Sequence, residues 1–521
     1  MRWFSLCSIA LAWVALGPVS AAAAEPEPDP ATTAEPDPED GAGGDSDGGV
    51  EIVPIDTDPD VGNTDLDGVE PVPEKELPKD GMAHRPGMPA VDRDMLSPRQ
   101  NGAGRGRASV EIAHIGEDTF LDLDFIYVFK VDAWRIAPQL PIRLRLIDED
   151  PESGGLIREE DWDEPSDWAR LLSFVQYGSY DQPFFFRYGE LNGVTIGHGS
   201  LVNRYFNTVD VDHYQGGLFA NFDADFAGGE VMLDNLFDPE ILVGRAYVRP
   251  FSGFDSWARP ARLLKFGVTA GADFTAPLAV STADGGVYAH PDWRPVVLAD
   301  EVAGLFSADI EVPAVSTPHF DLVPYTDFAT VDGKGFGWHL GTYVNIRFTP
   351  TAALRTRLEY RFQGKGYEPG YVSPFYEIQR YAHLSGDPKL AQLRDGRIGK
   401  QHSGFYLESD LKVDRAFRLT VLYSTRGGAR GQDLLTRLRL RDIGPVSLTL
   451  FLGRIGFDGL DNLFAADRTV WGTSLRLNLT DWLYVNGTVV NQWWLKHKDD
   501  GTGYFETDTN FSFGAGIMLQ I

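Results

Sequence analysis

The strongest constraint on this chain is a strict two-residue alternation of apolar and polar side chains that recurs through its C-terminal half. In "ALRTRLEYRF" (353–362), arginines and a glutamate occupy the odd positions and mainly apolar residues the even ones. The segments "GWHLGTYVNIRF" (337–348), "TRLRLR" (436–441) and "SLRLNLT" (474–480) alternate in the same way. Successive side chains of a strand point to opposite faces, so the pattern predicts strands with one apolar and one polar face.

The connections between these predicted strands alternate between short turns and long loops. Short turns fall near Val413, Asp442 and Thr480, whereas residues 364–401 and 456–468 form long connections. No stretch after Asn101 reaches eighteen consecutive apolar residues, so no transmembrane helix is expected. Aromatic residues at strand ends, such as Trp482, complete the pattern of a transmembrane antiparallel up-and-down β-barrel. A large secreted β-sandwich or propeller is the alternative.

From Ala108 to Ile521 the chain resembles the porin-like outer-membrane barrels of Gram-negative bacteria as a class. Its last segment, "NFSFGAGIMLQI", places apolar residues on one face and is similar to the C-terminal signal read by the barrel assembly machinery. It ends in Ile521, where the class usually ends in an aromatic residue. The alternating segments number 16–20, depending on how residues 171–249 are divided, and bacterial single-chain barrels have even strand numbers, so we expect an all-β barrel of about 18 strands. Short turns then face the periplasm, and the loops at 147–167, 273–302 and 364–401 face outward.

The N-terminal hundred residues have a different composition. Arg2, an apolar run and the small residues near Ala24 predict a cleaved signal peptide over 1–24, which would also remove Cys7, the single cysteine. Residues 25–80 hold nineteen acidic residues against Lys75 and Lys79, a net −17 of the chain's −30. We therefore expect a disordered acidic periplasmic segment over 25–107 and no nucleic-acid partner. Neither a cofactor nor a metal site is predicted, because the aspartates at 56–67 lack the glycine and glutamate of a calcium loop.

The predicted lumen suggests a channel. A barrel of this size is too wide for side chains alone to fill, which favours passive diffusion of small hydrophilic or charged solutes. The expected pore-lining residues form a basic wall on later strands and an acidic wall mainly on earlier ones, which would create a transverse field. The basic set is Arg347, Arg355, Arg357, Arg361, Arg418, Arg437, Arg439, Arg441 and Arg476, and the acidic set is Asp122, Asp124, Asp309, Glu311, Asp321 and Asp327. The alternative is that these charges are solvated or paired across strands.

A membrane-embedded hydrolase is the competing hypothesis. In "GHGSLVNRYFN", His198 and Ser200 are two residues apart and so share one face of a strand. This spacing resembles the His-x-Ser of outer-membrane phospholipase A and of the lipid A deacylase, although Leu201 stands where those families have asparagine. His198 and Ser200 occupy even-numbered positions, as do the apolar residues Val194, Ile196 and Val202, so all five would lie on the same face of a strand. We therefore expect His198 and Ser200 on the lipid-facing side, near the outward end of the strand. The flanking glycines favour a strand end instead.

Further expectations concern location and partners. Export and a barrel fold place the protein in the bacterial outer membrane, in contact with its lipids. A second copy of the chain, in a homo-oligomer, is a further candidate partner. In a third hypothesis the barrel is structural or adhesive, and the acidic segment tethers it to a periplasmic or cell-wall partner.

Overall fold

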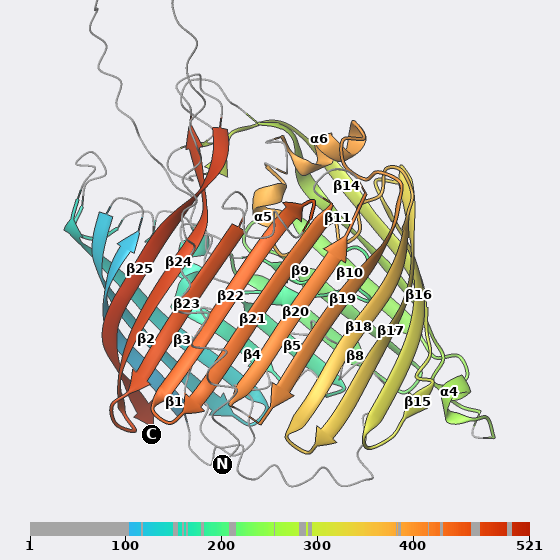
Figure 1. Ribbon diagram of the computed structural model, residues 1–521, viewed down its shortest axis with the longest axis horizontal. Helices are drawn as coiled ribbons and strands as arrows, with labels where there is room; N and C mark the ends of the chain where they lie inside the picture. The colour runs from blue at the N-terminus through green and yellow to red at the C-terminus, as the bar shows by residue number, and fades with distance from the viewer. Residues whose placement is uncertain are drawn as a thin grey trace, which may run out of the picture. The chain divides into compact units, whose positions relative to one another are not determined.

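In the computed structural model the chain forms a closed antiparallel β-barrel (Figure 1). The structure describes residues 104–520 except 116–117, 149–154, 159–160, 163–164, 179–181, 208–214, 255, 281–287, 290–293, 382, 384–386, 415, 428–430, 460–468 and 498–502. The described residues belong to the compact unit Asp47–Ile521. The predicted signal peptide and nearly all of the predicted acidic segment lie outside them.

Twenty strands form the wall, each paired with its sequence neighbours around the ring. They are β1 (Gly104–Ile115), β2 (Asp118–Val131), β3 (Trp134–Ile147), β4 (Leu172–Tyr177), β5 (Phe184–Gly189), β8 (Gly217–Asp223), β9 (Ala227–Leu233), β10 (Ile241–Val248), β11 (Lys265–Val280), β14 (Val297–Glu311), β16 (Phe320–Val331), β17 (Gly335–Thr349), β18 (Ala352–Gln363), β19 (His402–Val413), β20 (Phe417–Thr425), β21 (Gln432–Ile443), β22 (Val446–Phe457), β23 (Thr469–Asn478), β24 (Leu483–His497) and β25 (Gly503–Gln520). The ring closes where β1 pairs with β25, from Arg105 opposite Gln520 to His114 opposite Phe511.

Shorter elements lie in the connections. They are β6 (Asn192–Val194), β7 (Tyr205–Phe206), β12 (Tyr288–Ala289), β13 (Arg294–Pro295), β15 (Val315–Ser316), α3 (Pro165–Trp168), the 3-10 turn Ala169–Leu171, α4 (Arg259–Arg262), α5 (Tyr376–Gln379) and α6 (Lys389–Arg394). In the described part of the chain, no helix has the length and apolar character needed to cross a membrane.

The wall confirms the alternation read from the sequence. On β17, Trp338 and Leu340 are exposed on the outside, while His339 and Tyr343 are buried inside. On β25, Phe511 and Phe513 face outward as predicted. Large apolar side chains cover the exterior all around the ring; examples are Phe129, Phe266, Phe306, Phe328, Leu358, Phe405, Leu475 and Phe513. The barrel therefore has the apolar outer surface that a hydrocarbon environment requires.

The two ends of the barrel differ in their connections. One end, which we call the turn end, carries mostly short links such as 132–133, 350–351, 414–416 and 444–445. The opposite end, which we call the loop end, carries the connections 148–171, 190–216, 281–296 and 364–401, with α5 and α6 (Figure 1). The predicted alternation of short and long connections is confirmed. The barrel has 20 strands rather than about 18. The predicted loop over 273–302 is shorter, because β11 and β14 continue into both of its sides.

Candidate functional site

Residues 190–207, which we call the inner segment, fold into the barrel from the loop end. Their short strands β6 and β7 pair with each other rather than with the wall. The path turns at Gly193, Gly197 and Gly199, whose φ angles of 75°, 59° and 73° suit glycine. At Gly199 a Cβ would also lie 2.6 Å from Asn203 Oδ1 and 2.8 Å from Arg357 Nη1. Only glycine therefore fits this close approach to the wall.

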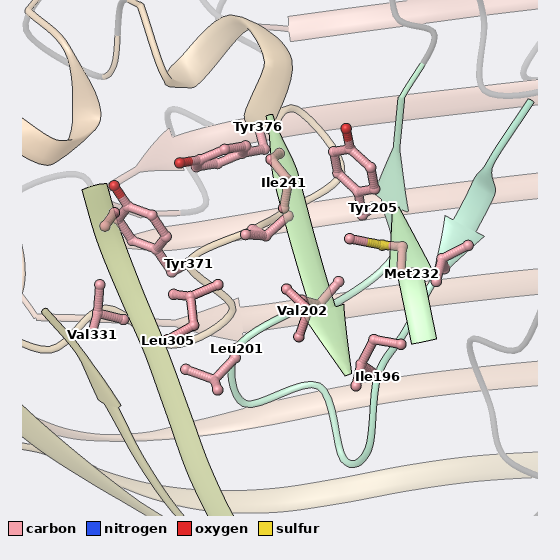
Figure 2. Packing of buried hydrophobic residues seen from close by; sticks show 14 of the residues in the cluster. Ile196, Leu201, Val202, Tyr205, Met232, Ile241, Leu305, Val331, Tyr371 and Tyr376 are labelled. Carbon is pink, nitrogen blue, oxygen red and sulfur yellow. The ribbon is translucent and has the colours of Figure 1, made fainter. Parts of the chain in front are cut away.

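An apolar cluster fills the space between the inner segment and one side of the barrel (Figure 2). Ile196, Leu201 and Val202 of the inner segment pack among inward-facing strand residues such as Met232 and Leu305. All five side chains are at most 3% exposed. This side of the lumen, spanning β5 to β16, is thus packed like a protein core.

His198 and Ser200 face the inner wall of the barrel, so their predicted placement on the lipid side is wrong. The His198 ring stacks on Tyr325 with centroids 3.9 Å apart, and its Nε2 lies 3.2 Å from Asp309 Oδ1. Its Nδ1 lies 3.2 Å from the Tyr343 hydroxyl. Ser200 Oγ donates to Asp327 Oδ2 at 2.8 Å. The alternation was misleading because these residues belong to a loop inside the barrel, where parity does not separate lipid from lumen.

Burial also argues against a reaction on membrane lipid at this pair. His198 is 1% exposed and Ser200 is 2% exposed. A nucleophile–base pair also needs a third group to orient the histidine, and the nearby polar residues Asn203, Asn207 and Asp210 are the candidates. Asn203 instead donates to the Tyr406 hydroxyl at 3.1 Å. Asn207 binds the backbone of Gln215 and Asp234, and Asp210 lies outside the described residues. The groups around His198 and Ser200 anchor a loop to the barrel.

The inner segment is also anchored to strands β18 and β19. Arg357 Nη1 donates to Asn203 Oδ1 at 3.0 Å, and Arg204 Nη2 binds Glu408 Oε1 at 2.8 Å. Glu408 is completely buried. The segment is therefore fixed inside the barrel by polar contacts with β14 and with β16 to β19.

The predicted lining residues on this side face inward, but most are neutralised by neighbouring strands. Asp309 forms a two-point ion pair with Arg245, at 2.6 and 2.9 Å. The other pairs are Glu311 with Lys265 at 3.1 Å, Asp321 with Arg347, and Glu359 with both Arg357 and Arg361. The acidic wall thus exists in position; Asp309, Glu311 and Asp321 are compensated by cations of the same wall, while Asp327 accepts the hydrogen bond from Ser200.

Residues 364–401, which we call the cap segment, lie at the loop end as predicted but fold inward. Val372 forms a parallel bridge with Val202, and Tyr367 donates its hydroxyl to the Ser200 carbonyl at 2.8 Å. Arg380 binds Glu240 and Asp273, which ties the cap to the rim at β10 and β11. On the far side, Phe375 and Ile378 pack against Ile455 and Val470 of β22 and β23. The cap therefore spans the mouth of the barrel.

Two buried titratable groups of the cap have shifted pKa values. Burial raises the pKa of Glu377 to about 7, and Arg380 opposes this shift. Glu377 accepts a hydrogen bond from Tyr205 of the inner segment at 2.6 Å. Burial lowers the pKa of Lys389 to about 7, against the opposing effect of Glu368. Lys389 Nζ donates to the Tyr371 carbonyl at 2.7 Å and to Gln379 at 2.9 Å. Glu377 thus joins the cap segment to the inner segment, and Lys389 joins two parts of the cap segment.

On the other side of the lumen, strands β20 to β24 carry several inward-facing side chains that are only half-buried. Ser474 is exposed although it lies on the inward-facing side of β23, opposite in parity to the exposed Trp471 and Leu475. The predicted lining residues Arg418, Arg437 and Arg476 are half-buried, and Arg439 and Arg441 are buried. Arg418 binds Asp410 at 2.7 Å, and Arg355 lies opposite the same aspartate across β18 and β19. Asp124 binds Arg107 at 2.7 Å, and Asp122 lies 3.7 Å from Arg143.

Sequence reasoning missed the two inward-folded segments and the cations that balance the acids. Arg245 lies in the strand sequence "ILVGRAYV", and Lys265 begins the next strand. The alternation of inward- and outward-facing positions along these strands could therefore have predicted that both side chains point inward. The fold of 190–207 left a weaker signal, the glycines spaced through "NGVTIGHGS". Glycine at these positions indicates a tight path, but it does not say which side of the wall the path takes.

Comparisons with known proteins give no family. No protein-family model matches the chain, and no curated protein matches it. Among solved structures, similarity is found to a ferric enterobactin receptor (PfeA) mutant from Pseudomonas aeruginosa, with 11% identity, TM-score 0.33, and coverage of 80% of this chain and 82% of that one. The carbohydrate-binding barrel Wzi, involved in Group 1 capsule assembly in Escherichia coli, has 10% identity, TM-score 0.32, and coverage of 81% and 85%. The siderophore receptor PirA from Acinetobacter baumannii has 9% identity, TM-score 0.35, and coverage of 81% of both chains. Similarity this distant carries no argument about what this chain binds.

Proposed function

We propose that this protein is an outer-membrane channel with a restricted passage for small hydrophilic solutes. The closed ring and its apolar exterior support a membrane location, because a barrel satisfies every backbone group without an open edge. Export through the predicted signal peptide would lead such a barrel to the outer membrane, with lipids around its wall and the short turns on the periplasmic side. The passage runs along β20 to β24 beside the inner segment and beneath the cap.

The observation that carries this proposal is the contrast between the two sides of the lumen. Around the inner segment, side chains of the wall such as Arg245, Glu311 and Arg357 are completely or almost completely buried. On the opposite side Ser474 is exposed on an inward-facing position, and Arg418 and Arg476 are half-buried. An inward-facing serine that water reaches indicates that the filling of the lumen is one-sided. A one-sided filling leaves a narrow path rather than the wide lumen of an open barrel.

Conductance of the purified protein in planar bilayers tests the proposal. We expect discrete single-channel steps from protein that also shows heat-modifiable gel mobility, the mark of a folded barrel. Replacing His198, Ser200 and Asn203 together with alanine removes side-chain anchors of the inner segment and should enlarge the steps or make them flicker. Lys334→Ala, at an exposed turn of the loop end, is the control and should match the wild type. A folded barrel that produces no single-channel current steps would contradict the proposal.

The hydrolase hypothesis has no observation in its favour once His198 and Ser200 are placed. Both are buried under the wall contacts described above, and neither reaches the exterior. The adhesive hypothesis concerns the acidic segment, which lies outside the described residues, and stays a prediction, as does homo-oligomerisation.

A further inference from the structure

Five consecutive strands of the barrel wall are short, and we call this part of the wall the low side. β4 and β5 have 6 residues each, β8 and β9 have 7, and β10 has 8, whereas every other wall strand has at least 9. A transmembrane β-strand needs about 9 to 11 residues at a tilt of about 45°. At about 3.4 Å per residue and that tilt, seven residues cover about 17 Å, less than the apolar band of about 25 Å in such barrels. The strands of the low side are therefore too short to cross the hydrocarbon by themselves.

The rim of the barrel steps down at both borders of the low side. β3 pairs with β2 as far as Ile147 but with β4 only as far as Pro138. The connection 148–171 covers part of that border, where Ile157 bridges to Leu144. β11 pairs with β14 along most of its length but with β10 only as far as Asp273. Both long strands continue toward the loop end, so the missing height of the wall lies there.

The connections of the low side carry exposed apolar side chains. The β9–β10 connection, residues 234–240 at the loop end, holds Leu236 and Phe237, and Phe237 is 55% exposed. The β8–β9 connection at the turn end holds Phe226, which is 68% exposed. At the same rise and tilt, the chain from Phe226 to Phe237 can cover up to about 26 Å. With these connections included, the low side reaches the height of the usual apolar band.

The backbone of the β9–β10 connection is bonded within the protein. The amide of Phe237 donates to Asn235 Oδ1 at 3.1 Å, and the amide of Glu240 donates to Asp234 Oδ1 at 3.2 Å. Both acceptor side chains are buried. Pro239 has no amide hydrogen to satisfy. Hydrocarbon, unlike water, requires this internal bonding, because it offers backbone groups no partner.

We propose that the β9–β10 connection is embedded in the bilayer and that Leu236 and Phe237 contact the acyl chains of its lipids. Lipid is the occupant because the connection continues the apolar exterior of the wall, where Leu242 is exposed on the outer face of β10. Inside the low side, Met232 and Val243 belong to the apolar cluster around the inner segment. The lipid therefore faces a solid wall. This inference rests on the membrane location in the proposed function, but not on channel activity.

Fluorescent probes at single cysteines test the proposal, with Cys7 replaced by serine throughout. Phe237→Cys and Lys334→Cys each place a label in a short connection at the loop end, the first on the low side and the second between the long strands β16 and β17. Each variant is checked for heat-modifiable mobility, labelled with an environment-sensitive fluorophore and reconstituted into phosphatidylcholine vesicles. Leu236→Cys is a second probe of the same connection, should cysteine at 237 prevent folding. Leu340→Cys, on the exterior of β17, reports insertion of the barrel.

Two quenchers distinguish lipid from water. With phosphatidylcholine that carries a nitroxide on its acyl chain, we expect the probes at 237 and 340 to lose most of their emission. The probe at 334 should keep its emission with this lipid and lose it with iodide added to the water. Iodide should leave the probe at 237 unchanged. No ion current is measured, so the result does not depend on whether the barrel conducts.

The outcomes separate the lipid contact from the membrane location. If iodide quenches the probe at 237 and the nitroxide lipid does not, the inference is overturned while the barrel and the channel stand. If neither quencher reaches that probe and Phe237→Cys forms disulfide-linked pairs in the bilayer, a second copy of the chain covers the connection, which also overturns the inference. If the probe at 340 escapes the nitroxide lipid, the barrel is not in the bilayer and the proposed function itself fails.

Discussion

At the scale of the residue, the direction of a side chain was predictable and its partner was not. Parity correctly placed His339, Arg357 and Glu359 inside the barrel. It could not show that Glu359 is shared by Arg357 and Arg361, at 2.5 and 2.6 Å, because that depends on rotamers within the lumen. Nor could it place His198 against Asp309, since these residues are 111 positions apart and meet only when the inner segment folds inward.

Gly199 offers a sharp test of the inner segment's path. Gly199 and Gly333 both have positive φ, 73° and 64°, so alanine costs about 1 kcal/mol or more of backbone strain at either position. At Gly199 the added Cβ also meets Asn203 and Arg357, whereas at Gly333 nothing lies within 4 Å. We predict that Gly199→Ala alters the channel's conductance and lowers its midpoint for thermal gel-mobility change more than Gly333→Ala does. Equal effects of the two substitutions would show that the inner segment does not follow this path.

At the scale of the element, the long connections were identified but their fold was not. The sequence indicated a long connection over 364–401, and the structure buries much of it against the inner segment and the wall. Whether such a loop extends outward or folds inward depends on contacts such as Arg380 with Asp273, which are remote in sequence. Alternation carries no information about these contacts, because the loop has no strand period.

The cap should be least stable near neutral pH. The folded-state pKa of Glu377 is raised, so the folded cap binds more protons than the unfolded one between about 4.5 and 7, and its stability falls as pH rises through that window. The folded-state pKa of Lys389 is lowered, so the unfolded cap binds more protons between about 7 and 10.5, and stability rises with pH there. Shifts of this size correspond to roughly 3 kcal/mol for Glu377 and roughly 5 kcal/mol for Lys389.

Hydrogen exchange of the cap amides between pH 5 and 9, corrected for intrinsic rates, measures this dependence. We expect protection to pass through a minimum near pH 7. Glu377→Gln should flatten the acidic side of the profile, and Lys389→Met the alkaline side. A protection profile that rises or falls steadily across the whole range would contradict the assignment of these two groups.

At the scale of the whole molecule, the barrel followed from the alternation and from the sequence of short and long joints. Strands such as β17 and β25, of 15 and 18 residues, provide many periods and were identified readily. The count was low because β4 and β5 have 6 residues and β8 and β9 have 7, within the region 171–249 where the pattern was unclear. Closure of the ring and the one-sided filling of the lumen are properties of the assembled wall and appear only in three dimensions.

The most direct test of the account is the reactivity of single cysteines on the two sides of the lumen. Ser474→Cys and Ser307→Cys both replace an inward-facing serine, on β23 and β14, but Ser474 is exposed and Ser307 is 2% exposed. Cys7 is the chain's one natural cysteine and is replaced by serine in both variants. With a charged methanethiosulfonate reagent added to open channels, we predict rapid modification and a stepwise fall in current for Ser474→Cys and no reaction for Ser307→Cys. Equal reactivity, or reaction at Ser307→Cys alone, would contradict a passage confined to the β20–β24 side.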